Sequence, residues 1–276
     1  MNFSADTVAV VTGAGSGIGR ALALALAEQK CALALVDIRT ADLADTKAQV
    51  EALGSRCTIH EVNVASRENM EHLATTVIDA HGSVALLFNN AGVTLVDEVT
   101  SITFEDFEWL MNINFWGVIY GTKAFLPHLL RAKSAHIVNI SSLFGLMGFP
   151  GQAAYNASKF AVRGFTEALK MELAHTSVGV SCVHPGGIKT NIVRNAKVGH
   201  LPGEVSSGEL VDEFDRIART TPAKAAQTIL RGVKKGKRRI LVGNDARVMD
   251  WVVRHFPGSY ETLLRLEARF QKVRQL

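Results

Sequence analysis

The stretch VAVVTGAGSGIGRALALALAEQK, residues 8–30, decides the fold because its pattern changes twice. A short β-prone apolar run at 8–12 leads through a glycine-rich loop into a helical pattern at 20–30. Further apolar runs, separated by helical patterns, follow at 32–37, 84–90, 136–142, 178–185 and 238–243. Runs without period-two alternation are typical of parallel strands covered by helices on both faces. The pattern therefore predicts an α/β fold, a Rossmann-type doubly wound parallel sheet flanked by helices.

The length of the chain suits one globular domain. Its 276 residues, 47% hydrophobic and 20% charged, are sufficient for a sizeable core and show no sign of disorder. We expect the domain to span residues 1–243. Within it, 191–222 is interpreted as an insertion that forms a substrate lid, because long insertions in compact domains are often functional. Residues 244–276 are expected to form a C-terminal helical extension of the same domain.

Cysteine usage and the first residues bear on the compartment. Three scattered cysteines form neither a disulfide framework nor a metal-ligand spacing. The N-terminal MNFSADTVAVV lacks the basic region and cleavage site of a signal peptide. Polar residues interrupt every hydrophobic run before the roughly 18 residues that a bilayer span requires. These features predict a cytoplasmic protein with no metal site and no transmembrane segment.

Positive charge is concentrated near the C-terminus. Residues 231–276 hold 12 Lys and Arg against 4 Asp and Glu. Binding to an anionic surface is one explanation. The basic cluster at 234–239, however, joins a predicted helix to a predicted strand and lacks interleaved aromatic residues, so we expect solvated charges and no nucleic-acid partner.

Two helices are expected in the C-terminal extension. The first would be capped by Asn244 or Asp245, and the second would begin near Ser259. The first carries Trp251 and Phe256, whose apolar area predicts docking on the protein body or on a partner subunit. The second pairs an apolar stripe with basic residues, which leaves attachment to an anionic membrane surface as the alternative.

The glycine-rich loop has the spacing of a dinucleotide-binding turn. Its glycines allow a tight turn, close approach of a pyrophosphate to the backbone, and close packing of helix on strand. The helix N-terminus then faces the phosphates. Alone, such a loop could be an ordinary strand-to-helix turn, but its place between a strand and a helix favours a dinucleotide. The predicted contacts are Gly13, Ser16, Gly17, Ile18 and Gly19.

Asp37 ends the second predicted strand, about 20 residues beyond the loop, where a carboxylate can accept hydrogen bonds from the adenosine ribose hydroxyls. This position favours NAD. A 2′-phosphate would lie against the same negative charge, and the nearby Arg39 could compensate only by displacing the carboxylate. NADP therefore remains the alternative cofactor.

Tyr155 and Lys159 lie four residues apart, which places both on one face of a helix. A phenol with its ordinary pKa of about 10 is a poor base near neutrality, but a neighbouring cation lowers that pKa. Such a pair is usually a surface contact, so its context decides. Ser142 ends a predicted strand at the sheet edge where ligands bind. Asn114 adds an amide on an otherwise apolar helix, with capping or a buried hydrogen bond as its alternative role.

Together these motifs carry a family resemblance. TGAGSGIG (12–19), NNAG (89–92), YNASK (155–159) and HPGGIKT (184–190) occur in this order, with Asn114 and Ser142 between them. Over residues 7–243 the chain resembles the short-chain dehydrogenase/reductase family, and within it the large single-domain branch with NAD-type specificity. The resemblance implies an NAD(P)-dependent oxidoreductase that interconverts a secondary alcohol and a ketone or aldehyde by hydride transfer.

The resemblance also implies roles for the catalytic residues. Tyr155 would be the general acid/base, and Lys159 would bind the nicotinamide ribose and lower the pKa of the tyrosine. Ser142 would orient the carbonyl oxygen. Asn114 would hold a relay water, and protons would pass from the substrate through Tyr155, the ribose hydroxyl and Lys159 to solvent.

Further cofactor contacts follow from the same resemblance. Asn63 and Val64 would lie beside the adenine, where the family commonly has an aspartate, and an amide can still donate and accept there. The residues implied at the adenosine ribose are Asn90, Ala91 and Gly92. Those implied at the nicotinamide end are Pro185, Gly186, Ile188 and Thr190, the last hydrogen-bonded to the carboxamide.

Ser142, Tyr155 and Phe144 are the expected substrate contacts. The apolar residues around them predict a hydrophobic alcohol or ketone. Arg194 and Lys197 in the expected lid leave a charged substrate open. The resemblance implies a homodimer or homotetramer formed through the helices that contain the catalytic residues. Two alternatives are an NADP-dependent carbonyl reductase and a non-catalytic NAD-binding sensor, which would have no need for a Ser-Tyr-Lys set.

Overall fold

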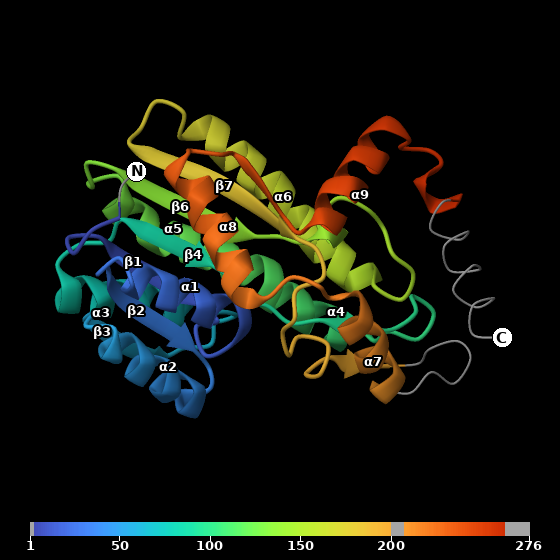
Figure 1. The fold of residues 1–276 in the computed structure, drawn as a ribbon, viewed down its shortest axis with the longest axis horizontal. Helices are drawn as coiled ribbons and strands as arrows, with labels where there is room; N and C mark the ends of the chain where they lie inside the picture. The colour runs from blue at the N-terminus through green and yellow to red at the C-terminus, as the bar shows by residue number, and fades with distance from the viewer. Residues whose placement is uncertain (1–2, 200–206, 263–276) are drawn as a thin grey trace.

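The computed structural model describes residues 3–199 and 207–262, and its centre is a seven-stranded sheet (Figure 1). Every neighbouring pair of strands is parallel, in the order β3-β2-β1-β4-β6-β7-β9. The strands are β1 Val8–Thr12, β2 Ala32–Asp37, β3 Cys57–Glu61, β4 Leu86–Asn89, β6 Ala135–Ile140, β7 Val178–Pro185 and β9 Arg239–Val242. The chain winds outward from β1 and then from β4 in the opposite direction. This confirms the predicted doubly wound parallel sheet.

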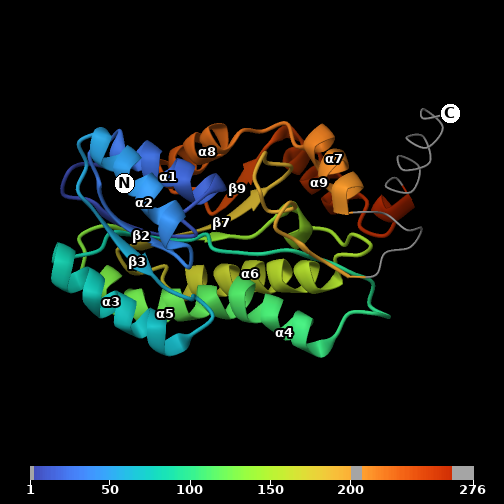
Figure 2. The same cartoon turned by 90° about the horizontal axis from the view of Figure 1, so that it is seen from below.

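Helices cover both faces of this sheet, as Figure 2 shows from its edge. One layer contains α1 Gly17–Ala27, α2 Thr40–Ala52 and α8 Pro222–Lys234. The opposite layer contains α3 Arg67–His81, α4 Phe104–Met111, α5 Gly117–Leu129 and α6 Ala153–Glu172. Because helices cover both faces, the central strand β1 is buried along its whole length. A separate cluster of buried apolar residues lies on each side of the sheet.

The observed strands show where the apolar-run criterion works and where it fails. The predicted runs at 32–37 and 178–185 have the bounds of β2 and β7. The edge strand β3 does not stand out as an apolar run, because its residues CTIHE mix polar with apolar side chains and only the first is buried. The two-residue strands β5 Leu95–Val96 and β8 Lys197–Val198, which form a separate parallel pair, are too short for any periodicity.

The segment 191–222 contains β8, helix α7 Ser207–Ile217 and the first residue of α8. Thr221 caps α8, since its hydroxyl accepts a hydrogen bond from the backbone N–H of Lys224. Strand β8 pairs with β5, which follows β4, so the segment is tied to the carboxyl end of the central sheet. In Figures 1 and 2, α7 lies at the same end of the molecule as the C-terminal helix α9.

Helix α9, Asn244–His255, is the first of the two helices expected in the extension. Gly243, and not Asn244 or Asp245, is its cap residue. Trp251 and Phe256 remain 55% and 45% exposed, so the described residues of the protein body do not cover them, and docking on a partner subunit stays a prediction. The second expected helix lies largely outside the described residues. No helix in the described ranges combines the length and the apolarity that a membrane span requires.

Candidate active site

The glycine loop links β1 to α1 through a left-handed turn. Gly13 and Gly17 have φ angles of 66° and 54°, which glycine adopts without a steric penalty. A Cβ on Gly19 would lie 2.0 Å from the carbonyl oxygen of Gly13, so the helix reaches the turn only without a side chain there. Ser16 precedes α1 and Ile18 lies in its first turn. All five predicted loop residues therefore lie around a helix N-terminus, whose N–H groups suit an anion.

Asp37, at the end of β2, faces this loop. Its Oδ2 accepts a hydrogen bond from the backbone N–H of Gly15 at 3.0 Å. Its Oδ1 accepts from the N–H groups of Ile38 at 2.8 Å and Arg39 at 3.2 Å. The carboxylate is thus fixed by three backbone donors beside the glycine turn, where the sequence places the adenosine ribose.

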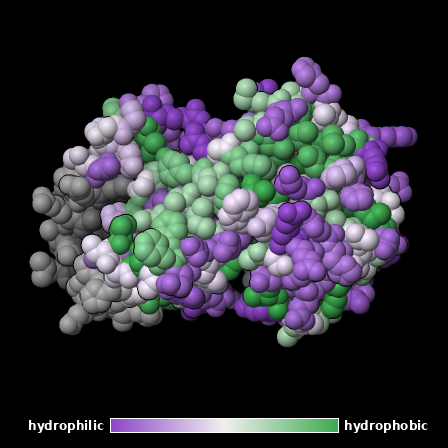
Figure 3. Space-filling model, turned by 180° about the vertical axis from the view of Figure 1, so that it is seen from behind, coloured by the Kyte–Doolittle hydropathy of each residue, from purple (hydrophilic) through white to green (hydrophobic). Residues whose placement is uncertain are grey.

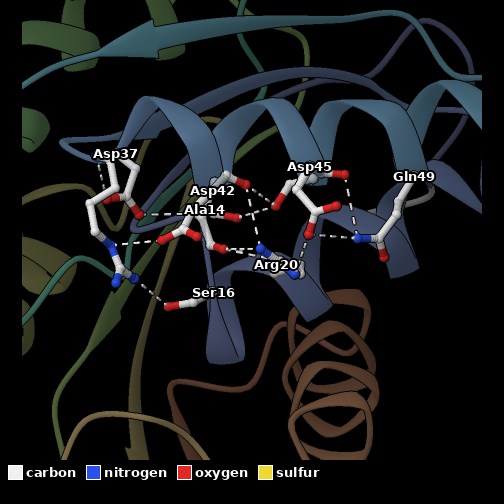
Figure 4. A network of polar contacts seen from close by, with 10 residues as sticks. Ala14, Ser16, Arg20, Asp37, Asp42, Asp45 and Gln49 are labelled. Carbon is white, nitrogen blue, oxygen red and sulfur yellow. Dashed lines mark hydrogen bonds and ion pairs between the residues drawn. The ribbon is translucent and has the colours of Figure 1, made fainter. Parts of the chain in front are cut away.

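Arg39 joins a surface network in which Figure 4 shows Asp37, Asp42 and Ser16 close together. Its Nε pairs with Asp42 Oδ2 at 2.8 Å, and its Nη2 donates to the hydroxyl of Ser16 at 3.3 Å. The guanidinium therefore already has an anionic partner, three residues further along the chain. Both side chains of the pair are partly exposed, so solvent screens the interaction.

The catalytic candidates meet at the carboxyl end of β6. Ser142 follows that strand, and its Oγ accepts a hydrogen bond from the backbone N–H of Phe144 at 3.1 Å. Tyr155 and Lys159 lie in the first turns of α6 and are only 8% and 4% exposed. The Lys159 ammonium lies 5.5 Å from the centre of the Tyr155 ring and donates to the carbonyl oxygen of Ile140 at 3.1 Å. The three predicted residues are therefore brought together, with Tyr155 and Lys159 buried and Ser142 half-buried.

Burial changes the proton affinities of this site. It raises the pKa of Tyr155, while the hydrogen bond with Ser142 acts in the opposite direction. Burial also lowers the pKa of Lys159 to about 8. In the protein alone, loss of solvent favours the neutral form of both groups, and the lowering of the Tyr155 pKa by Lys159 stays a prediction.

Asn114 is buried in a π-helical turn that joins α4 to α5, a geometry that is common at functional sites. Its Oδ1 accepts from the backbone N–H of Val93 at 2.8 Å. Its Nδ2 donates to the Val93 carbonyl at 2.9 Å and to the Ser158 hydroxyl at 3.2 Å. A Cβ on Gly92 would lie 3.1 Å from Asn114 Oδ1 and 3.4 Å from Lys159 Nζ. The structure thus gives Asn114 the buried hydrogen bonds of its alternative role and places it and Lys159 on the same glycine, Gly92.

The predicted contacts on the adenosine side follow β3 and β4. The backbone N–H groups of Asn90 and Ala91 donate to the Thr12 hydroxyl at 2.9 and 3.0 Å, which ties the end of β4 to the end of β1. Val64 is buried, whereas Asn63 is partly exposed and its Oδ1 accepts from the backbone N–H two residues further on. These residues lie at the carboxyl ends of the parallel strands, as the glycine loop does.

The segment after β7 connects the glycine loop with the predicted catalytic residues. Pro185 ends β7, and the N–H of Gly186 bonds to the last residue of β9 at 2.9 Å. Ile188 forms a parallel bridge to the segment before α8. A Cβ on Gly17 would lie 3.1 Å from the Cγ2 of Thr190. The predicted nicotinamide contacts therefore begin at the catalytic edge and end against the glycine turn.

Two further residues have contacts that sequence reasoning did not assign. His184 Nδ1 lies 3.0 Å from the carbonyl oxygen of Ser142. Burial lowers the pKa of His184 to about 4, so the ring is neutral near pH 7 and donates this hydrogen bond. Ser158 donates to the Tyr155 carbonyl at 2.8 Å while accepting from Asn114. Both lie within the quoted motifs, but their partners become apparent only in the fold.

The surroundings of Tyr155 are apolar and aromatic. Phe144 packs edge-on against Tyr155, with ring centres 6.1 Å apart, and stacks on Phe149 at 5.1 Å. Phe149 is partly exposed, so these rings lead from the surface to the phenol of Tyr155.

The two cations of the insertion are engaged elsewhere. Arg194 pairs with Asp215 of α7. Lys197 Nζ lies 2.6 Å from Asp106 and 4.1 Å from the centre of the Trp109 ring. Each cation thus has an intramolecular counter-ion, which weakens the case for a charged substrate.

Comparison with known proteins agrees with this geometry. The family model for short chain dehydrogenases matches residues 7–199. Mycobacterium tuberculosis SadH, named as an oxidoreductase, is 48% identical over 259 residues, 93% of either chain. A Drosophila melanogaster dehydrogenase/reductase SDR family protein 7-like is 32% identical over 92% of this chain and 78% of its own. A Burkholderia phymatum short chain dehydrogenase/reductase, solved in complex with NAD, has a TM-score of 0.86 at 28% identity and covers 95% of this chain and 96% of its own. The chain belongs to the short-chain dehydrogenase family of oxidoreductases.

Proposed function

We propose that this chain is an NAD-dependent oxidoreductase that interconverts a hydrophobic secondary alcohol and the corresponding ketone, or an aldehyde. The observation that carries the proposal is that the half-buried Ser142 and the buried Tyr155 and Lys159 come together at the carboxyl end of the sheet. The segment from His184 to Thr190 joins this group to the glycine loop. A protein that only sensed a nucleotide would have no use for a buried phenol and ammonium in this position.

The residues of the chain supply positioning and proton transfer. Tyr155 Oη would exchange a proton with the substrate oxygen, and Ser142 would hold that oxygen through its hydroxyl. The buried ammonium of Lys159 would stabilise the phenolate form by its charge. When bound, NAD supplies the hydride acceptor or donor. The aromatic wall of Phe144 excludes water from the phenol and favours an apolar substrate.

The residues present fit a dinucleotide. The left-handed turn at Gly13 and Gly17 leaves the start of α1 free of side chains that would block phosphates. Asp37 offers a carboxylate for two ribose hydroxyls and repels a 2′-phosphate, which supports NAD as the preferred cofactor. The NAD complex of the Burkholderia phymatum relative also supports NAD. Arg39 lies near enough to Ser16 to keep NADP as the specific alternative.

We assign the domain organisation in the same way. Residues 1–243 form one Rossmann-type unit, 191–222 cover the substrate side, and 244–276 are an extension of that unit. The pairing of β8 with β5 supports a lid that is anchored at its first half. The three cysteines are free and buried, which supports a reducing compartment such as the cytoplasm.

A homodimer or homotetramer fits the surface of α5 and α6. A band of hydrophobic residues crosses the face formed by α4, α5 and α6 (Figure 3). On α6 its exposed positions repeat at helical spacing: Ala157, Phe160, Gly164, Ala168 and Met171. Small residues between two large apolar ones allow a second helix to approach closely, and an exposed patch of this kind is typical of a subunit interface.

The test is a substrate panel with both cofactors. The purified protein is assayed by nicotinamide absorbance with hydrophobic secondary alcohols and NAD or NADP, and with matching ketones and the reduced cofactors. We expect turnover with NAD(H) on apolar substrates, and turnover at least about 100-fold slower with Tyr155→Phe. NAD binding without turnover on any substrate would favour the sensor, and faster turnover with NADP(H) would favour the NADP-dependent carbonyl reductase.

A further inference from the structure

The nicotinamide segment is held by a side chain from outside the matched family region. Asp245 lies in the first turn of α9, beyond the residues 7–199 that the family model covers. Its Oδ2 accepts a hydrogen bond from the backbone N–H of Gly187 at 2.6 Å. The two residues are 58 positions apart. A carboxylate of the C-terminal extension is therefore in direct contact with the loop that leads to Ile188 and Thr190.

The loop is shaped around this carboxylate. A Cβ on Gly186 would lie 2.1 to 2.4 Å from the three carboxyl atoms of Asp245, and a Cβ on Gly243 would lie 2.2 Å from its Oδ1. Real Cβ atoms do not come so close to other atoms, so both positions admit only glycine while Asp245 stays in place. Gly243 also has a φ of 101°, which L side chains rarely adopt. Two glycines thus leave the space that Asp245 fills.

The remaining bonds of the loop show what Asp245 adds. The N–H of Gly186 bonds to the carbonyl of Val242 at 2.9 Å, and the carbonyl of Gly187 accepts from the N–H of Thr220 at 3.3 Å. The N–H of Lys189 bonds to the carbonyl of Thr220 at 2.9 Å. Asp245 satisfies the intervening N–H of Gly187, in a pair of glycines that would otherwise be the most mobile part of the loop.

We propose that Asp245 is a positioning residue for the nicotinamide half of the cofactor, because it fixes the Gly186–Gly187 peptide and so the direction of residues 188–190. This proposal rests on the proposed function, which places the nicotinamide at that segment. It makes the C-terminal extension part of the cofactor site. A plain helix-capping role for Asp245, near the positive end of α9, would instead affect stability alone.

A comparison of two ligands distinguishes a role in positioning the nicotinamide from a role in capping the helix. NADH and ADP-ribose differ only in the nicotinamide ring, so a defect confined to residues 188–190 weakens NADH and spares ADP-ribose. For Asp245→Ala we expect the Kd for NADH, measured by calorimetry, to rise about tenfold while the Kd for ADP-ribose stays within about twofold. Asp245→Asn keeps an acceptor oxygen at the same place and should recover most of the NADH affinity. Gly186→Ala should reproduce the Asp245→Ala pattern, because its methyl group displaces the carboxylate.

Asp250→Asn is the matched control, since Asp250 anchors the same helix by an ion pair with Arg239 away from the loop. It should affect the melting temperature of the protein but not the ratio of the two dissociation constants. Equal loss of both ligands in Asp245→Ala, or no loss of either, would overturn the proposal. Failure of the wild-type protein to bind NADH at all would instead overturn the proposed function, so the two failures are distinguishable.

Discussion

The two ends of the site, which we propose bind the adenosine and carry out catalysis, are stabilised in different ways. At the adenosine end, Asp37, Arg39 and Asp42 form a surface network in which the Arg39 and Asp42 side chains are 47% and 36% exposed. At the catalytic end, Tyr155 and Lys159 are almost completely buried. Burial raises the pKa of Tyr155 and lowers that of Lys159, so it favours the neutral form of each group. One end is charged and solvated, and the other is enclosed.

Because of this difference, we expect the adenosine end to select the cofactor and the catalytic end to carry out the reaction. Exposed ion pairs contribute about 0 to 1 kcal/mol and exchange partners readily, so the adenosine end can distinguish cofactors and tolerate substitution. When a buried polar group loses its hydrogen-bond partner, the cost in stability is several times larger. The catalytic end should therefore tolerate almost no substitutions. Substitutions at the two ends are expected to differ in size and in salt dependence.

Tyr155→Phe should have the largest effect. Loss of the phenolic hydroxyl removes general acid/base catalysis, so kcat should fall by about 10²- to 10⁴-fold. The Kd for NADH should change little, because the cofactor contacts expected from Asp37 and the glycine loop are untouched. Steady-state kinetics and calorimetry on the same preparation measure both. Retention of more than about a tenth of the wild-type activity would remove Tyr155 from its proposed role.

His184 extends the contrast to acid stability. Its pKa is lowered by burial to about 4, against 6.5 for the unfolded chain. Between these values the unfolded chain binds a proton that the folded His184 does not, so stability falls as the pH drops from 6.5 towards 4. This one group should cost roughly 2 kcal/mol between pH 7 and pH 4.5.

His184→Asn tests this contribution of His184 to the loss of stability at acid pH, because asparagine keeps a donor for the Ser142 carbonyl and does not titrate. Urea unfolding at pH 7 and pH 4.5 should show a smaller acid loss in the variant than in the wild type. The buried His136, whose pKa is also lowered by burial to about 4, accounts for a residual loss in both. The exposed His175→Asn serves as the control. An identical acid loss in wild type and His184→Asn would contradict the assignment.

The contrast also explains what could be predicted from sequence. The glycine loop, β1, β2 and β7 follow from local patterns, namely glycines at fixed spacing and uninterrupted apolar runs. Strand β3 does not, because its residues mix polar with apolar side chains and only the first is buried. The shift in the pKa of Tyr155 depends on burial, which a four-residue spacing with Lys159 does not reveal. The contacts of His184 and Asp245 join residues 42 and 58 positions apart, and only the fold brings them together.

Asp37→Ala should have a smaller effect that is confined to cofactor choice. We expect wild-type kcat/KM to be at least about tenfold greater with NAD than with NADP, or about 1.4 kcal/mol. Without the carboxylate, attraction of the ribose hydroxyls and repulsion of a 2′-phosphate disappear together, so the ratio should approach one. The kcat with NAD at saturation should stay near the wild-type value. A ratio that does not change would place the basis of selection elsewhere.

The smallest predicted effect concerns Asp42, which pairs with Arg39 and so keeps that guanidinium from a 2′-phosphate. Asp42→Asn should raise kcat/KM with NADP by about two- to fivefold and leave NAD nearly unchanged, because an exposed pair is worth less than about 1 kcal/mol. Asp45→Asn removes the same charge from the same helix but releases Arg20 instead, so it is the matched control. Its effect on NADP use should be smaller.

Two further measurements identify the cause of this gain. In the double variant Asp42→Asn/Arg39→Ala the gain should vanish, because the freed guanidinium produces it. Raising the ionic strength to about 0.5 M should reduce the gain in the single variant, since the Debye length then falls well below its value of about 8 Å at physiological salt. Catalysis at Tyr155, enclosed from solvent, should respond far less to the same salt. A gain that persisted without Arg39 would show that Asp42 acts through its own charge and not by holding its neighbour, and a gain that persisted at high salt would show that its cause is not electrostatic.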